Sequence, residues 1–217
     1  MQHIVIAIDG PAASGKSSVS RALARRLGYI YVNTGAMYRA VTWHALQLSV
    51  DPSDGTAVRE MLDAASLECD VEDGQSCFRV NGVDPGEALV SPVVNAAVSK
   101  IASQPDVRKR LVDLQRSYGA RHHSVMEGRD IGTVVFPETP HKFYIAASPE
   151  GRAARRAGQG LEDSVVQRDA MDSSRANSPL MIASDAQLID SSHASVDEVV
   201  LEVLKRLASQ GVFAPNR

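Results

Sequence analysis

The chain has little cysteine and no long apolar run. Of its 217 residues only Cys69 and Cys77 are cysteines. They flank an expected hairpin turn and could face each other across it, but we expect them to stay reduced, because no basic region with a cleavable apolar segment precedes the first strand. No apolar run reaches the length that a bilayer-spanning helix needs. These absences favour a cytoplasmic protein without a membrane span.

Metal-ligand spacing and a strong net charge are also missing. None of the six histidines has the spacing of a metal site, and the adjacent His122 and His123 cannot both point into one site. The net charge of −3 gives no general affinity for nucleic acid or for anionic membranes. With 44% apolar and 23% charged residues, the composition is that of an ordinary soluble domain. We expect one α/β domain without a structural metal, and a monomer, because no exposed apolar stripe demands a partner.

What the sequence does contain is a glycine loop between a strand and a helix. The apolar, β-branched run at 3–8 has the character of a buried parallel strand, and 18–27 has helical spacing. This context supports a G-x4-G-K-[ST] phosphate-binding loop. Its amides and the helix N-terminus would hold the phosphates of a nucleoside triphosphate. The predicted nucleotide-binding residues are Gly10, Pro11, Ala12, Ala13, Ser14, Gly15, Lys16, Ser17 and Ser18.

The rest of the chain predicts a parallel sheet flanked by helices. Further strands are expected at 29–32, 67–71, 77–80, 124–127, 141–147 and 187–189, and further helices at 36–48, 56–65 and 92–101, after Pro105, and from 149 and 195. The pair of strands joined by a turn after residue 66 does not fit a simple parallel alternation. We therefore expect a core of about 1–65, 120–150 and 185–217, a small mixed insertion of about 66–119, and an Arg-rich, Gly-broken lid of about 151–184.

Arginines at turns and strand ends indicate a second, phosphorylated substrate. Guanidinium groups present planar forks that suit phosphate. Arg129 is the strongest of them, because it follows a core strand and substrates gather at the carboxyl ends of such strands. The chain has neither the N-K-x-D motif of guanine-specific switches nor the acidic pair of motor ATPases. The residues alone therefore predict a phosphotransferase with a second anionic substrate.

Four motifs in order along the chain resemble those of the bacterial-type cytidylate kinases, a family of nucleoside monophosphate kinases. They are D-G-P-A-A-S-G-K-S-S, N-T-G-A-M-Y-R, the helix pair around 95–110, and E-G-R-D-I-G-T-V-V-F-P. The resemblance implies a P-loop core domain with a monophosphate-binding insertion and a short lid. It also implies the reaction of ATP with CMP or dCMP to give ADP and the nucleoside diphosphate, with Mg²⁺ as cofactor.

The resemblance assigns phosphate contacts to individual residues. Thr34 and Arg39 match the turn that binds the monophosphate, and Arg129 matches a further phosphate ligand. Arg175 matches an arginine that reaches the phosphates. With Lys16, which offsets charge on the transferring group, Arg129 and Arg175 are the expected catalytic residues, and the Ser17 hydroxyl is the expected Mg²⁺ ligand. No general base is required, because the attacking phosphate oxygen is already ionised at neutral pH.

The base and the pentose have their own matches. Ser99, Arg108 and Asp130 match positions that face the cytosine, and Arg168 and Asp172 match residues that hold the pentose. The chemistry of the base agrees, since a carboxylate accepts from the cytosine N4 amine but meets a lone pair at uracil O4. A mismatched buried polar group costs roughly 1–3 kcal/mol. We expect CMP and dCMP to be good substrates and UMP a poor one.

Two points stay open. Asp9, just before the loop, either organises Mg²⁺ through water or has a structural role. The lid departs from the family pattern, with only 11 residues between Arg156 and Arg168 and with Ala170, Met171 and Ser173 where charged residues are common. The alternatives are a small-metabolite kinase of the shikimate or gluconate type and a nucleotide-binding module with a degenerate lid.

Overall fold

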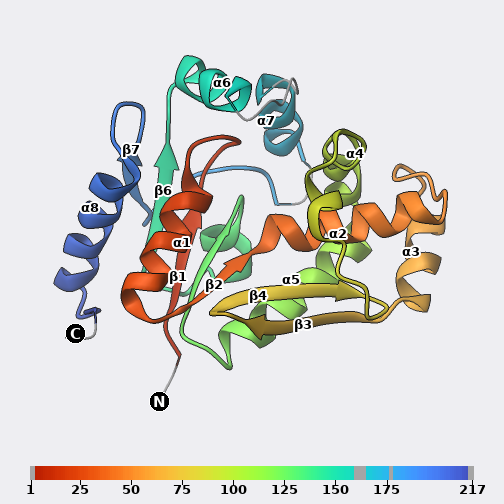
Figure 1. The fold of residues 1–217 in the computed structure, drawn as a ribbon, viewed down its shortest axis with the longest axis horizontal. Coiled ribbons are helices and arrows are strands. Elements are labelled where there is room, and N and C mark those ends of the chain that lie inside the picture. The colour runs from red at the N-terminus through yellow and green to blue at the C-terminus, as the bar shows by residue number, and fades with distance from the viewer. Residues whose placement is uncertain (1–2, 159–164, 176–177, 215–217) are drawn as a thin grey trace.

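A seven-stranded sheet forms the centre of the molecule (Figure 1). The computed structural model describes residues 3–158, 165–175 and 178–214. The strands run in the order β3-β4-β2-β5-β1-β6-β7, and every pairing is parallel except β3 with β4. Their bounds are Val5–Asp9 (β1), Ile30–Asn33 (β2), Leu67–Glu72 (β3), Gln75–Val80 (β4), Ser124–Gly128 (β5), Lys142–Ala146 (β6) and Gln187–Asp190 (β7).

Helices cover both faces of this sheet, which confirms the predicted fold class. One apolar core lies between the sheet and α1 (Lys16–Leu27) and α8 (Val196–Ser209). The other lies between the sheet and four helices, α2 (Thr34–Gln47), α3 (Gly55–Ala64), α4 (Pro92–Ser103) and α5 (Pro105–Gly119). In Figure 1, α6 (Pro149–Ala157) and α7 (Val165–Ser173) stand above the carboxyl ends of the central strands. β1 is buried along its whole length, as expected of a parallel strand covered on both faces.

Side-chain caps explain where several helices begin. Asn33 accepts the Ala36 N–H at the start of α2, and Asp54 accepts two N–H groups at the start of α3. Ser195 and Glu198 form the predicted capping box of α8. The predicted cap at Ser91 is different: this residue precedes α4, but its side chain makes no capping hydrogen bond. Pro at the first helical position still marks the start.

The β3–β4 hairpin is attached to the edge of the central sheet. β4 pairs with β2 only at Tyr31 and Gln75, next to a hydrogen bond from Tyr31 N to Gly74 O of 3.0 Å. The turn is shorter than expected, because Asp73 and Gly74, with φ of 49° and 74°, complete it alone.

The two cysteines do not face each other. Cys69 is paired with Phe78, and Cys77 with Asp70, so their side chains lie on opposite faces of the hairpin. Both are free thiols.

Three short segments were not expected from the sequence. They are a 3₁₀ turn, η1 (Gly86–Val90), a π-helical turn, η2 (Ile131–Val135), and α7, which lies within the segment predicted as a Gly-broken lid. The turn η2 directly follows the G-R-D residues after β5. Among the described residues no helix is both long and apolar enough to cross a membrane.

Candidate active site

A pocket of about 770 Å³ lies at the carboxyl ends of the strands. Its lining brings together nearly all the residues that the sequence predicts for the site: Ala12, Ala13, Ser14, Gly15, Lys16, Ser17, Ser18, Thr34, Arg39, Ser99, Arg108, Arg129, Asp130, Asp172 and Arg175. Gly10 and Pro11 are not part of the lining but contact it through their carbonyl groups. Arg168 belongs to α7, and its side chain is outside the described part of the structure.

The loop between β1 and α1 has the wrapped shape that its glycines allow. A Cβ at Gly10 would clash with the Ile145 carbonyl oxygen of β6, and Gly15 has a φ of 88° immediately before α1. Lys16 Nζ donates to the Pro11 carbonyl at 3.0 Å, which folds the lysine back over the loop. The Ser14 hydroxyl is fully buried and has no hydrogen-bond partner in the part of the chain that the structure describes. The loop therefore offers an unsatisfied polar group and a lysine to a phosphate.

Glu127, at the end of β5, is a site residue that the sequence reasoning did not assign. It is 3% exposed, accepts from Ser17 Oγ through Oε2 at 2.9 Å, and accepts from Tyr31 Oη through Oε1 at 2.7 Å. Burial, followed by the charge of Glu127, raises the pKa of Tyr31, so the phenol stays a donor. An acidic residue ending the strand next to β1 was the available signal. Ser17 and Glu127 together present the hard oxygen atoms that Mg²⁺ prefers.

A buried ion pair joins Arg108 of α5 to Asp130, the residue before η2. The two side chains are 6% and 7% exposed. Arg108 also donates to the Ala102 carbonyl at 3.2 Å, and its guanidinium carbon lies over the ring of Tyr38, 5.5 Å from the ring centroid. Burial raises the pKa of Asp130. The pair gives this end of the pocket hydrogen-bond donors and acceptors that are almost fully buried.

Asp172 of α7 draws two of the predicted phosphate ligands together. It accepts from Arg129 Nε at 2.8 Å, pairs with Arg175, and lies 3.4 Å from Ser99 Oγ. Arg129 also donates to the Gly10 carbonyl at 3.1 Å, which ties it to the phosphate loop. Arg175 Nε is buried and has no hydrogen-bond partner among the described residues. The cluster therefore contains one guanidinium N–H that these residues leave unsatisfied.

The N-T-G-A-M-Y-R segment, at the end of β2 and the start of α2, forms another part of the pocket lining. Thr34 Oγ1 donates to the Glu127 carbonyl at 2.7 Å, so the end of β2 is fixed to the end of β5. Arg39 Nε contacts Asn95 Oδ1 of α4 at 3.4 Å, and Asn95 in turn donates to the Val90 carbonyl at 2.8 Å. These contacts place Arg39 across the pocket from the loop.

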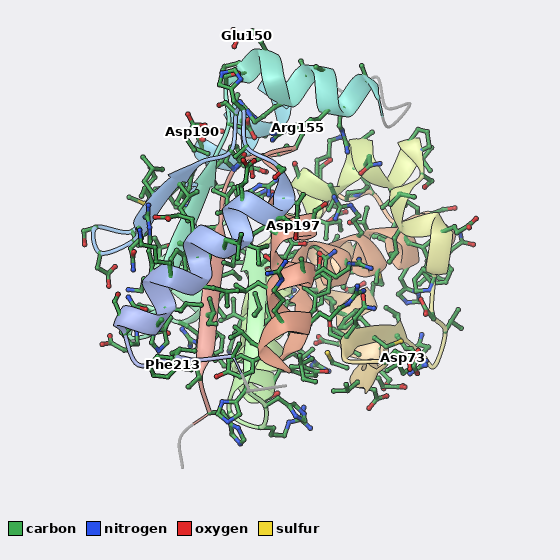
Figure 2. The ribbon with its side chains drawn as sticks, turned by 60° about the vertical axis from the view of Figure 1, so that its left-hand side comes forward. Asp73, Glu150, Arg155, Asp190, Asp197 and Phe213 are labelled. Carbon is green, nitrogen blue, oxygen red and sulfur yellow. The ribbon has the colours of Figure 1, made fainter. Side chains whose placement is uncertain are left out.

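Arg152 and Arg155 of α6 and Asp169 of α7, to which the sequence analysis assigned no role, lie next to the phosphate loop. Arg155 donates to the Ser191 carbonyl at 2.5 Å, and Ser191 Oγ donates to the Ser14 carbonyl at 2.7 Å. Figure 2 shows Arg155 on the side of α6 that faces the rest of the molecule. Asp169 accepts the Ala12 N–H at 3.1 Å and pairs with Arg152. Side chains of α6 and α7 are therefore in contact with the loop.

Comparison with solved structures places the fold among small kinases. A gluconokinase from Sinorhizobium meliloti 1021 superimposes with a TM-score of 0.51 at 14% identity, over 96% of this chain and 93% of that one. At this identity the likeness shows the fold alone.

Comparison of sequences is more specific. A bifunctional pantoate ligase/cytidylate kinase from Prochlorococcus marinus is 46% identical over 90% of this chain, which spans only 43% of that longer protein. A cytidylate kinase from Corynebacterium efficiens is 44% identical over 93% of both chains. The family model for cytidylate kinase matches residues 6–209. The chain belongs to the cytidylate kinase family.

Proposed function

We propose that the protein transfers the γ-phosphoryl group of ATP to CMP or dCMP, giving CDP or dCDP and ADP. The observation that carries this proposal is the single pocket in which the phosphate loop faces both an arginine cluster and the buried Arg108–Asp130 pair. A phosphate loop alone serves any nucleotide, whereas the other two groups suit an anionic acceptor with a polar base. The relatives' names agree with this acceptor.

On the donor side, the loop amides and Lys16 bind the β- and γ-phosphates of ATP. Ser17 and Glu127 would hold Mg²⁺, which neutralises phosphate charge when it is bound. Glu127 keeps the Ser17 hydroxyl oriented by accepting a hydrogen bond from it, and Tyr31 keeps Glu127 in place by donating another. Arg155, next to the loop, adds positive charge above it.

On the acceptor side, Arg39, Arg129 and Arg175 neutralise the monophosphate so that two anions can approach. An oxygen of the CMP phosphate then bonds to the γ-phosphorus of ATP while the bond from that phosphorus to the bridging oxygen breaks, and ADP leaves. Positioning and electrostatic stabilisation supply the rate, because no proton has to be removed first.

The Arg108–Asp130 pair selects the base. A carboxylate has more acceptor positions than one arginine occupies, so Asp130 can also accept from the cytosine N4 amine. Arg108 and Ser99 can donate to N3 or O2. Uracil would place its O4 acceptor against the carboxylate, which gives a tenfold to hundredfold preference for CMP at about 1–3 kcal/mol per mismatch.

Several further statements belong to the same proposal. We place the enzyme in the cytoplasm, as a monomer without nucleic acid or membrane partners. We also retain the division into a core, a monophosphate-binding insertion at about 66–119 and a lid at about 151–184, with Arg168 and Asp172 holding the pentose.

The test is a coupled ADP-release assay with Mg-ATP and each of CMP, dCMP, UMP, AMP, GMP, gluconate and shikimate. Fast release with CMP and dCMP alone is expected. Release only with gluconate or shikimate would replace the proposal with a small-metabolite kinase. No release with any acceptor, despite binding of ATP and CMP, would make the protein a nucleotide-binding module whose lid no longer supports transfer.

A further inference from the structure

The end of β1 is joined to the segment that carries Arg129 and Asp130. Asp9, the last residue of β1, is 5% exposed and accepts the N–H of Ile131 through Oδ1 at 2.8 Å and that of Gly132 through Oδ2 at 2.7 Å. The neighbouring Gly10 carbonyl accepts from Arg129 Nη1 at 3.1 Å. Three hydrogen bonds thus connect the start of the phosphate loop to residues 129–132.

The carboxylate of Asp9 accepts two backbone N–H groups, one through each of its oxygen atoms. The first N–H groups of a helical turn have no partner within the turn, and here they are buried. A carboxylate accepts both of them, whereas the amide of an asparagine has only one acceptor atom. Because both oxygens of Asp9 are used by backbone N–H groups, the structural role that the sequence left open is favoured over organisation of Mg²⁺.

The other end of η2 is held independently. Arg116 of α5 donates to the Val135 carbonyl at 3.0 Å and to the Val134 carbonyl at 2.8 Å. Loss of the Asp9 contacts would therefore leave the far end of the turn in place and release the near end. The near end is the one that directly follows Arg129 and Asp130.

We propose that Asp9 is a positioning residue for phosphoryl transfer, which sets the distance between the phosphate loop and the acceptor-binding groups Arg129 and Asp130. The inference rests on the proposed function, since it concerns alignment of CMP with ATP. Asp9 touches neither substrate in this scheme; it acts through the backbone of η2. Phosphoryl transfer is sensitive to such alignment, because positioning supplies much of its rate.

The test compares Asp9→Asn with a control, Asp54→Asn. Asp54 also accepts two backbone N–H groups, at the start of α3, but it does so through Oδ1 alone, so asparagine can keep both; it is exposed and is not part of the pocket lining. Leaving a buried N–H unpaired predicts a fall in kcat/KM for CMP, and in CMP affinity by calorimetry, of about 10-fold to 100-fold for Asp9→Asn. ADP affinity should change less than about threefold, because the loop itself is intact. Asp54→Asn should leave all three quantities at the wild-type level.

The outcomes separate this inference from the proposed function. Wild-type protein that neither binds nor phosphorylates CMP would overturn both. An active wild type with an equally active Asp9→Asn variant, or a variant that loses ADP and CMP affinity equally, would overturn only the role of Asp9. If Asp9→Asn does not fold, amide exchange in the wild type decides: the N–H groups of Ile131 and Gly132 should be protected and should gain protection with CMP but not with ADP. Unprotected amides, or amides unaffected by CMP, would refute the proposal.

Discussion

The two sides of the pocket are built in different ways. The proposed donor side is a run of nine consecutive residues, 10–18, whose shape follows from two glycines between a strand and a helix. The proposed acceptor side takes its groups from the β2–α2 turn, α4, α5, the segment after β5 and α7. The proposed donor site is therefore encoded in one short segment, whereas the proposed acceptor site exists only when distant elements are packed together. A substitution on one side should therefore leave ligand binding on the other side intact, whereas a substitution at the link between them, Asp9, should affect their alignment.

The largest effect is expected from breaking the donor side alone. Lys16→Met should lower kcat by about 10²–10³-fold, because it removes one positioned positive charge from the transferring group. CMP affinity measured by calorimetry should stay within about threefold of wild type, since the acceptor groups come from other elements. Lys205→Met, at an exposed position on α8, is the control. A parallel loss of CMP affinity would mean that the two sides are not separable.

The hydrogen bonds between Asp9 and η2, which connect the two sides, should depend on pH. Burial raises the pKa of Asp9 from 3.8 to about 6, an effect larger than that of its backbone N–H partners and of the nearby Asp130 and Lys16. Between these two values the folded protein keeps a proton that the unfolded chain has released, so stability falls as pH rises from about 4 to 6, by at most about 3 kcal/mol. CMP affinity should rise over the same window, because only the ionised carboxylate accepts both N–H groups of η2.

Urea unfolding of wild type and Asp9→Asn between pH 4 and 7 measures this contribution. The difference in unfolding free energy between the two proteins isolates Asp9, since Asp130, Lys16, Tyr144 and Lys142, the charged or titratable groups around it, are common to both. CMP affinity is compared in the same way, so that titration of the CMP phosphate cancels. The same pH slope in both proteins would contradict the prediction.

A smaller effect is expected from breaking the acceptor side alone. Asp130→Asn removes the negative charge that pairs with Arg108 and leaves one acceptor oxygen in place of two, so Arg108 and the cytosine amine compete for it, and kcat/KM for CMP should fall about 10-fold to 100-fold. UMP turnover should fall less, which lowers the ratio of CMP to UMP activity. Asp106→Asn, exposed in the first turn of α5, is the control. An unchanged ratio would show that the carboxylate does not read the base.

The smallest effect is expected at Glu127, one of the two proposed Mg²⁺ ligands. Tyr31→Phe removes one donor to Glu127 and should raise the Mg²⁺ concentration for half-saturation about tenfold. Direct binding of Mn²⁺ to the protein–ADP complex, followed by its paramagnetic resonance, should weaken equally. Tyr29→Phe, in the neighbouring position beside His123, should leave both values unchanged. Wild-type metal affinity in Tyr31→Phe would show that Glu127 needs no support from β2.

The same contrast explains what the sequence could predict. The donor loop, the order of strands and helices and the fold class follow from spacing and glycine positions, and the structure confirms the fold. The acceptor-binding residues could be predicted only from resemblance to a family, because the sequence spacing of Ser99, Arg108 and Asp130 does not indicate that they line the same pocket. Comparison with known sequences confirms that the chain belongs to the family. The individual roles of Ser99, Arg108 and Asp130 stay predictions.

Some features could not be read from local patterns at all. Glu127 was visible as an acidic strand end, but its contact with Ser17 depends on β5 lying beside β1. The π-helical turn η2 has no sequence signature, since tertiary contacts from Asp9 and Arg116 satisfy its ends.

The β3–β4 hairpin has a consequence for self-association. β3 is an edge strand, and its exposed backbone is a template on which another chain can add a strand. Glu68, Asp70 and Glu72 lie on one of its faces, and Arg79 of β4 pairs with Asp70 and Glu72. A second copy added edge to edge would bring like charges together across the new pairing, which is unfavourable. The acidic edge thus protects the sheet against aggregation at one of its two ends.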